Sequence, residues 1–223
     1  MIIIFKNKLN WYIRITFVVY LLTIFFFHNL SNRYIYFMIL NVSLAYIPFE
    51  LSNAVKFTKN KFLIIFFSCF WLVFYPNAPY LLTDFFHLEA LNIYSTQATF
   101  NPYLSDWAAF SVITLGILFG YIIGIISMYN VYNQFKKEIA PRSGLIFSSL
   151  FVVITSLLSG FAIYLGRFPR LHTHYLLENP MKIINIILEN INMQSFAFSI
   201  LMALWQIPII VTFILFKRQF EKK

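Results

Sequence analysis

The chain has 223 residues, of which 60% are hydrophobic and 11% are charged, and its formal net charge is +9. A water-soluble domain of this length could not cover so much apolar surface, so the composition excludes that class and predicts a single membrane domain over residues 1–223. The positive charge does not indicate nucleic-acid binding, because the basic residues flank apolar runs and no nucleic-acid-binding motif is present.

Six apolar runs have about the length of a transmembrane helix, which needs about 20 residues at a rise of about 1.5 Å each. They predict an all-α integral membrane protein, a bundle of about six transmembrane helices whose main partner is the lipid bilayer. The expected spans are residues 13–30, 34–49, 62–82, 107–129, 143–165 and 195–216. Glu50 and Asp106 fall at the ends of these spans and no ionisable residue falls near the middle of one. This argues against a proton-coupled transporter, which usually carries such groups at mid-membrane.

The third span is interrupted by two prolines, Pro76 and Pro79. The apolar run before them, from Phe62 to Tyr75, corresponds to roughly 21 Å of helix, whereas the hydrocarbon core is about 30 Å thick. The prolines are therefore expected within the outer leaflet, where broken backbone must lie against protein or a water-filled cavity.

A short helix is expected to begin at Ala78 with Asn77 as its cap. A spacing of three and four residues along that helix places Asp84 and His87 side by side. The residues expected to share this face are Tyr80, Thr83, Asp84, His87 and Leu91.

The fourth span carries Gly116, Gly120 and Gly124, a spacing that lets two helices approach closely. Packing within the chain is the favoured interpretation, and an oligomer formed through these glycines is the alternative. Further along, Asn179-Pro180 is expected to start an amphipathic helix that is too short to span and lies on the outer surface of the bilayer.

Lysine and arginine alternate in abundance between successive connections. The N-terminus, the second and fourth connections and the C-terminus hold 13 of them, whereas the other connections hold 4. The positive-inside rule then predicts that both termini are cytoplasmic. All four histidines and most acidic residues fall on the outer side, which is where the chemistry is expected.

Two interpretations of the outer polar residues stay open. Asp84 and His87 are candidate catalytic residues, since a carboxylate and an imidazole can act as an acid/base pair. Arg167 and Arg170 are suited to gripping a phosphate or carboxylate, which suggests a lipid head group or lipid-linked anionic substrate. The other interpretation is a structural ion pair between one of these arginines and Asp84 or Glu89. His172 and His174 are weak candidates for a metal site, because their spacing is not diagnostic.

The segments FYPNAPYLLTDFFHL and SGFAIYLGRFPR resemble a family of bacterial multipass membrane proteins known as domain of unknown function 1361. The resemblance covers most of the chain beyond the first span, and it implies no particular activity. After Arg170 the family pattern differs from this chain, which has His172 and His174 in that segment. The two histidines are therefore not part of the family pattern, which argues against a metal role for them. The residues that carry the family pattern are Asn77, Pro79, Tyr80, Thr83, Asp84, His87, Arg167 and Arg170.

The sequence therefore favours a protein of the bacterial plasma membrane, with a cell-envelope enzyme as one hypothesis. Its catalytic residues would be Asp84 and His87, and its substrate-binding residues Asn77, Tyr80, Thr83, Arg167 and Arg170. The alternative is a non-catalytic membrane subunit or a small-solute permease. The sequence assigns no cofactor.

Overall fold

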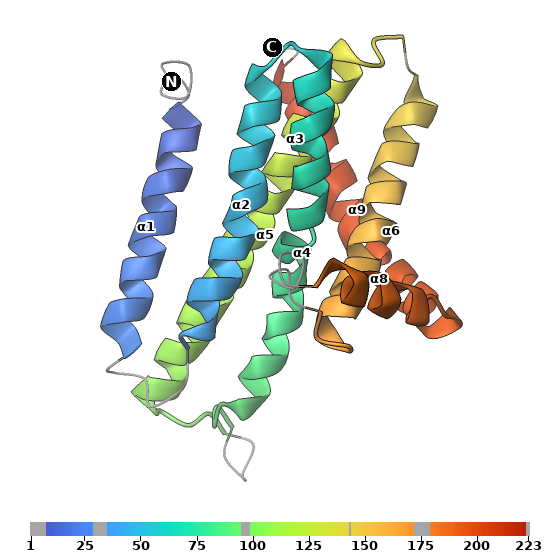
Figure 1. Ribbon diagram of the computed structural model, residues 1–223. Helices are drawn as coiled ribbons and strands as arrows, with labels where there is room; N and C mark the ends of the chain where they lie inside the picture. Colours follow the sequence, from blue (N-terminus) through green and yellow to red (C-terminus); the bar gives the residue numbers. More distant parts are fainter. Residues whose placement is uncertain (1–7, 29–34, 95–98, 143, 172–178, 222–223) are drawn as a thin grey trace. The chain divides into compact units, whose positions relative to one another are not determined.

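The computed structural model describes residues 8–28, 35–94, 99–142, 144–171 and 179–221 (Figure 1). Within these residues, six helical segments are long and apolar enough to cross a membrane, which confirms the predicted all-α multispan membrane protein. The chain divides into two compact units, Met1–Val131 and Tyr132–Lys223, and each is described by itself. The six segments are α1 (Lys8–His28), α2 (Phe37–Phe57), the stretch Lys61–Ala90, α5 (Leu104–Glu138), α6 (Leu145–Arg167) and α9 (Met193–Glu221).

The second span is longer than predicted, and this overturns one conclusion from the sequence. The midpoint of α2 is residue 47, so Glu50 lies three residues past it and not at a helix end. In the structure Arg14 of α1 pairs with this carboxylate, which offsets much of the cost of placing it inside the helix.

The helix α5 also runs beyond its predicted end. It continues to Glu138, whereas the predicted span ended at residue 129.

In the first unit, α1 and α2 form an antiparallel pair. The rings of His28 and Tyr36 lie 4.0 Å apart near the connection, and those of Phe17 and Tyr46 are stacked at 4.1 Å further along. Arg14 then meets Glu50 in α2. From one contact to the next, the residue of α1 lies nearer the N-terminus of α1 and its partner lies nearer the C-terminus of α2. These contacts fix the register of the two helices.

The predicted break in the third span is present. The helix α3 covers Lys61–Phe74, α4 covers only Asn77–Tyr80, and the 3-10 helix η2 continues from Leu81 to Ala90 (Figure 1). The break thus leaves one continuous spanning segment, Lys61–Ala90, rather than a helix that stops inside the membrane.

Two details of the break differ from the prediction. Asn77 does not cap the following helix; its side-chain Nδ2 donates to the carbonyl of Phe74 at 2.9 Å and so satisfies the end of α3. The segment after Tyr80 is wound as a 3-10 helix over ten residues, not as an α-helix. In a 3-10 helix every third residue lies in one column, so Asp84 is aligned with His87, while Thr83 falls in the column of Tyr80.

The glycines of α5 allow neighbouring segments of the first unit, including the broken span, to pack closely against this helix. A Cβ atom added at Gly120 would collide with the side chain of Leu81, and one at Gly124 would collide with the Cβ of Ala78. One added at Gly116 would collide with Tyr20 of α1 and Met38 of α2. These three glycines therefore serve packing within the chain.

In the second unit, α6 packs closely against α9. A Cβ atom at Gly160 would lie 2.7 Å from the backbone oxygen of Ser199, so the two backbones come together at this point. The short helix α8 (Pro180–Glu189) begins where it was predicted, with the side chain of Asn179 accepting from the backbone nitrogen of Lys182 at 3.0 Å. Ile183 is buried, whereas Ile184 and Leu188 are exposed.

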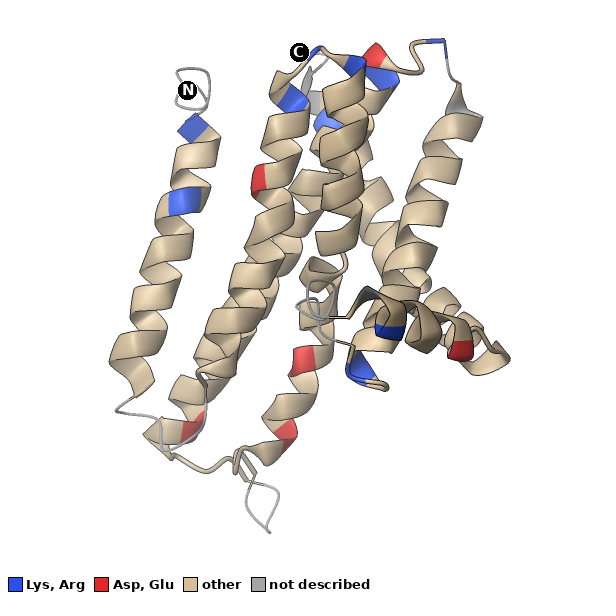
Figure 2. Ribbon diagram, viewed as in Figure 1, with Lys and Arg blue, Asp and Glu red and all other residues tan. Residues whose placement is uncertain are grey.

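Apart from Glu50, the acidic and basic residues described on the helices of the first unit lie toward opposite helix ends (Figure 2). The first residue of α1 is Lys8 and the first residue of α3 is Lys61, and the last turn of α2 contains Lys56. Asp84 and Asp106 lie toward the opposite end, on η2 and in the first turn of α5.

Candidate functional site

Asp84 and His87 come together on η2. The Nε2 atom of His87 lies 3.8 Å from Oδ1 of Asp84, as their three-residue spacing predicts. The side chain of Asp84 is completely buried, whereas that of His87 is 47% exposed. The pair therefore consists of a carboxylate inside the protein and an imidazole at its surface.

The surroundings of the pair come from the first two helices. Asn41, one turn into α2, donates from Nδ2 to Oδ2 of Asp84 at 2.8 Å. The ring of Phe37 lies 4.4 Å from the ring of His87. The hydroxyl of Tyr20 in α1 lies within electrostatic range of Asp84 and donates to the carbonyl of Val112 at 3.0 Å.

Sequence reasoning missed Asn41, although a signal existed. An asparagine inside an apolar span needs a polar partner, and the carboxylate of Asp84 was the side chain with the same need.

Replacing Asn41 by leucine is expected to destabilise the protein by about 1–2 kcal/mol, because a buried charge loses a hydrogen-bond donor. Thermal unfolding in detergent would measure the loss. Asn41→Asp places a second carboxyl group beside Asp84 and is expected to be at least as harmful. Unchanged unfolding temperatures for both variants would contradict a supporting role for Asn41.

The other residues predicted near the break have local hydrogen bonds. Thr83 is buried and donates from Oγ1 to the carbonyl of Tyr80 at 2.6 Å. Asn77 is engaged with the end of α3, and Tyr80 is half-buried. A substrate-binding role for these three residues stays a prediction.

Arg167 and Arg170 belong to the second unit. Arg167 is the last residue of α6 and is half-buried, whereas Arg170 is exposed and has a positive φ of 55° in the turn that follows. That turn is closed by a hydrogen bond from the backbone nitrogen of Leu171 to the carbonyl of Leu165 at 2.9 Å. His172 and His174 lie outside the described residues. Within the part of the chain that the structure describes, no group of three or more histidine, cysteine or acidic side chains is arranged to hold a metal ion.

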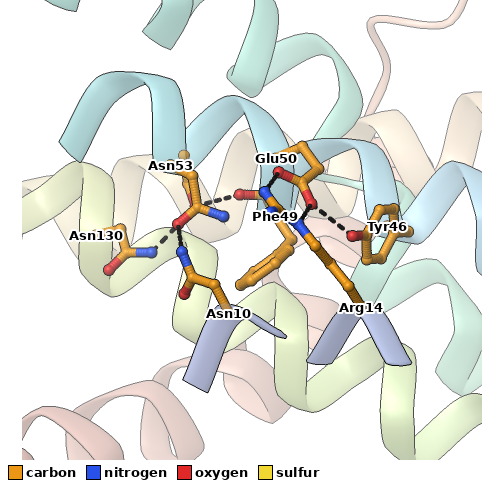
Figure 3. A network of polar contacts seen from close by, with 8 residues as sticks. Asn10, Arg14, Tyr46, Phe49, Glu50, Asn53 and Asn130 are labelled. Carbon is orange, nitrogen blue, oxygen red and sulfur yellow. Dashed lines mark hydrogen bonds and ion pairs between the residues drawn. The ribbon is translucent and has the colours of Figure 1, made fainter. Parts of the chain in front are cut away.

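A second polar group, which the sequence analysis missed, joins α1 to α2 (Figure 3). Arg14 donates from Nε to Oε1 and from Nη2 to Oε2 of Glu50, at 2.8 and 2.7 Å, and the Tyr46 hydroxyl also donates to Oε1. The side chains of Arg14 and Glu50 are 21% and 35% exposed. The bidentate geometry of this pair supports a role in fastening α1 to α2.

Further polar contacts lie one helical turn away from this ion pair. Asn10 of α1 donates to Oδ1 of Asn53 in α2 at 2.9 Å. Asn130 of α5 donates to the hydroxyl of Ser52 at 3.2 Å (Figure 3). Three helices of the first unit are therefore connected by side-chain hydrogen bonds at nearly one level. Arg14 and Glu50 are equally far along the chain from His28 and Tyr36, whose rings lie tilted against each other near the connection, so the ion pair follows once the register of the two helices is fixed.

Comparison with known proteins identifies a family. A family model described as protein of unknown function (DUF1361) matches residues 40–211, which include Asn41, Glu50, Asp84 and His87 but not α1. No curated protein and no solved structure matches the chain.

Proposed function

The chain belongs to the family described as protein of unknown function DUF1361, and from this premise we propose that it is an enzyme of the bacterial cell envelope. His87 is its general acid/base and Asp84 the residue that positions it. The observation that supports this proposal most directly is the arrangement of the pair, with the carboxylate buried and the imidazole exposed.

The chemistry follows from the environment of each group. The side chain of Asn41 donates a hydrogen bond to Oδ2 of Asp84 and so holds the carboxylate in place. That carboxylate lies 3.8 Å from Nε2 of His87 and keeps this side of the ring turned toward the protein. The other ring nitrogen, Nδ1, then exchanges a proton with the substrate. This arrangement suits hydrolysis or group transfer at a head group.

The substrate is a lipid or a lipid-linked anionic molecule on the outer side of the plasma membrane. The distribution of lysine and arginine supports cytoplasmic termini and hence an η2 that faces the outer side. Six helices of membrane length favour a substrate that reaches the protein through the bilayer. Arg167 and Arg170 are the proposed anion-binding residues of the second unit, because guanidinium groups grip phosphate and carboxylate bidentately.

The proposal predicts that His87→Ala abolishes function without unfolding the protein. A deletion strain would be complemented with wild-type protein, His87→Ala, and Glu89→Gln as a matched control for an exposed ionisable side chain on η2. Wild type and Glu89→Gln are expected to restore the envelope lipid composition. His87→Ala is expected to leave the envelope lipids as they are in the deletion strain, because losing a general acid/base lowers turnover by about 10²-fold or more. Full restoration by His87→Ala would refute the proposal.

A second candidate function is favoured by the complete burial of Asp84. In this alternative the protein is a non-catalytic membrane subunit or a small-solute permease, and Asp84 is a structural link between η2 and α2. Asp84→Asn separates the two candidates, since it keeps an acceptor for Asn41 but removes the charge. If Asp84→Asn lowers the unfolding temperature while His87→Ala restores the lipids, the structural alternative is correct.

A further inference from the structure

The connection between η2 and α5 carries an exposed aromatic surface. Tyr94, Phe100 and Tyr103 are 65%, 62% and 57% exposed. Together with Trp107, in the first turns of α5, they form what we call the aromatic shelf. The sequence from Leu91 to Ser105 contains no lysine, arginine, aspartate or glutamate. A connection exposed to water would be expected to carry such residues.

Hydrogen bonds and ring contacts hold the shelf together. The backbone nitrogen of Asn101 donates to the carbonyl of Ile93 at 2.8 Å, and Nε1 of Trp107 donates to the carbonyl of Asn101 at 2.8 Å. The rings of Tyr94 and Phe100 lie 4.8 Å apart, and those of Phe100 and Trp107 lie 6.0 Å apart. Hydrogen bonds to the backbone of Ile93 and Asn101 thus join the two described sides of the connection on which the apolar rings lie.

The shelf is continuous with surfaces of the first unit that are suited to lipid. Leu104, the first residue of α5, is 73% exposed, and Leu115 and Leu118 further along the same helix are 56% and 49% exposed. Phe86 on η2 is 77% exposed. An exposed apolar patch of this kind marks an interaction surface, and here it extends from helices of membrane length.

We infer that the aromatic shelf binds the lipid surface itself, in the head-group layer of the leaflet at the η2 end of the first unit. Tyrosine and tryptophan side chains favour this layer, because their rings are apolar and their polar atoms reach water or head groups. The absence of charge and the continuity with α5 favour lipid over a protein partner. This inference goes beyond the proposed function and does not depend on it. Because Leu91 directly follows η2, a shelf seated in the head groups also holds His87 near their depth.

Site-specific fluorescence in vesicles tests the inference. The full chain with Cys69→Ala would carry a single new cysteine labelled with nitrobenzoxadiazole, in vesicles of phosphatidylcholine and phosphatidylglycerol. Tyr94→Cys and Phe100→Cys report on the shelf. Lys59→Cys, in the exposed connection between α2 and α3, is the control in water, and Leu118→Cys is the control in hydrocarbon.

Shelf labels are expected to emit at shorter wavelength than the Lys59 label and to be quenched several times less by iodide. A nitroxide at carbon 5 of the acyl chain should quench them more than one at carbon 12, with the order reversed at Leu118. Iodide quenching equal to that at Lys59 would show that the shelf lies in water. Protection from both iodide and the lipid nitroxides would show that protein covers it. Either result would overturn the inference, whether or not His87→Ala affects the envelope lipids.

Discussion

Replacing Arg14 by glutamine is expected to lower the free energy of unfolding by about 2 kcal/mol, because the carboxylate of Glu50 is left inside α2 without its cationic partner. Removing one member of a fully buried pair costs about 3–5 kcal/mol, and the partial exposure of both side chains reduces that figure. Helix pairs in membranes gain little from apolar burial against each other, so the ion pair carries a large share of the attachment of α1. Thermal unfolding in detergent would measure the effect.

Two further variants make this prediction specific. Tyr46→Phe removes one hydrogen bond to the same carboxylate and is expected to cost only about 0.5–1 kcal/mol. The exchanged pair Arg14→Glu with Glu50→Arg is expected to recover part of the stability, as a coupled pair does. If the exchanged protein loses as much free energy of unfolding as the two single variants lose together, the two side chains do not fasten α1 to α2.

Replacing Gly124 by alanine is expected to destabilise the protein by about 2–3 kcal/mol, because the new methyl group overlaps the Cβ atom of Ala78. That atom is fixed to the backbone of α4, so relief requires α5 and the broken span to separate. Gly120→Ala should cost less, since it collides with the end of the flexible side chain of Leu81. Unfolding in detergent again gives the measurement.

Controls for this prediction are available within the chain. A Cβ atom added at Gly144 meets nothing within 4 Å, so Gly144→Ala has no steric cost and is expected to lose only the small N-cap preference of glycine over alanine at the start of α6, well under the loss at Gly124. Adding Ala78→Gly to Gly124→Ala removes the second methyl group and should restore most of the lost stability. Failure of this second change to help would mean that α4 does not pack on α5 through this contact.

The spans, the break and the neighbouring positions of Asp84 and His87 could be predicted because each depends on local sequence. The apolar runs set the helices, the two prolines set the break, and a three-residue spacing brings two side chains together in either kind of helix. The identity of the family was also available from the motifs around these residues.

Contacts between helices could not be predicted in the same way. Helices such as α1 and α5 are apolar on all sides, so no stripe in their sequences marks the face that meets a neighbour. The pairing of Asn41 with Asp84, and that of Arg14 with Glu50, depends on the register between helices. The 3-10 winding after Tyr80 was likewise hidden, since it coincides with tight packing of Leu81 and Ala78 along the glycines of α5.

The length of η2 depends on its winding. A 3-10 helix rises about 2.0 Å per residue and an α-helix about 1.5 Å, so rewinding these ten residues would shorten the segment by about 5 Å. The same change would turn His87 by about 60° around the axis relative to Asp84. The pitch of one short segment therefore determines how closely the imidazole is aligned with its carboxylate and how far it stands from the proline break.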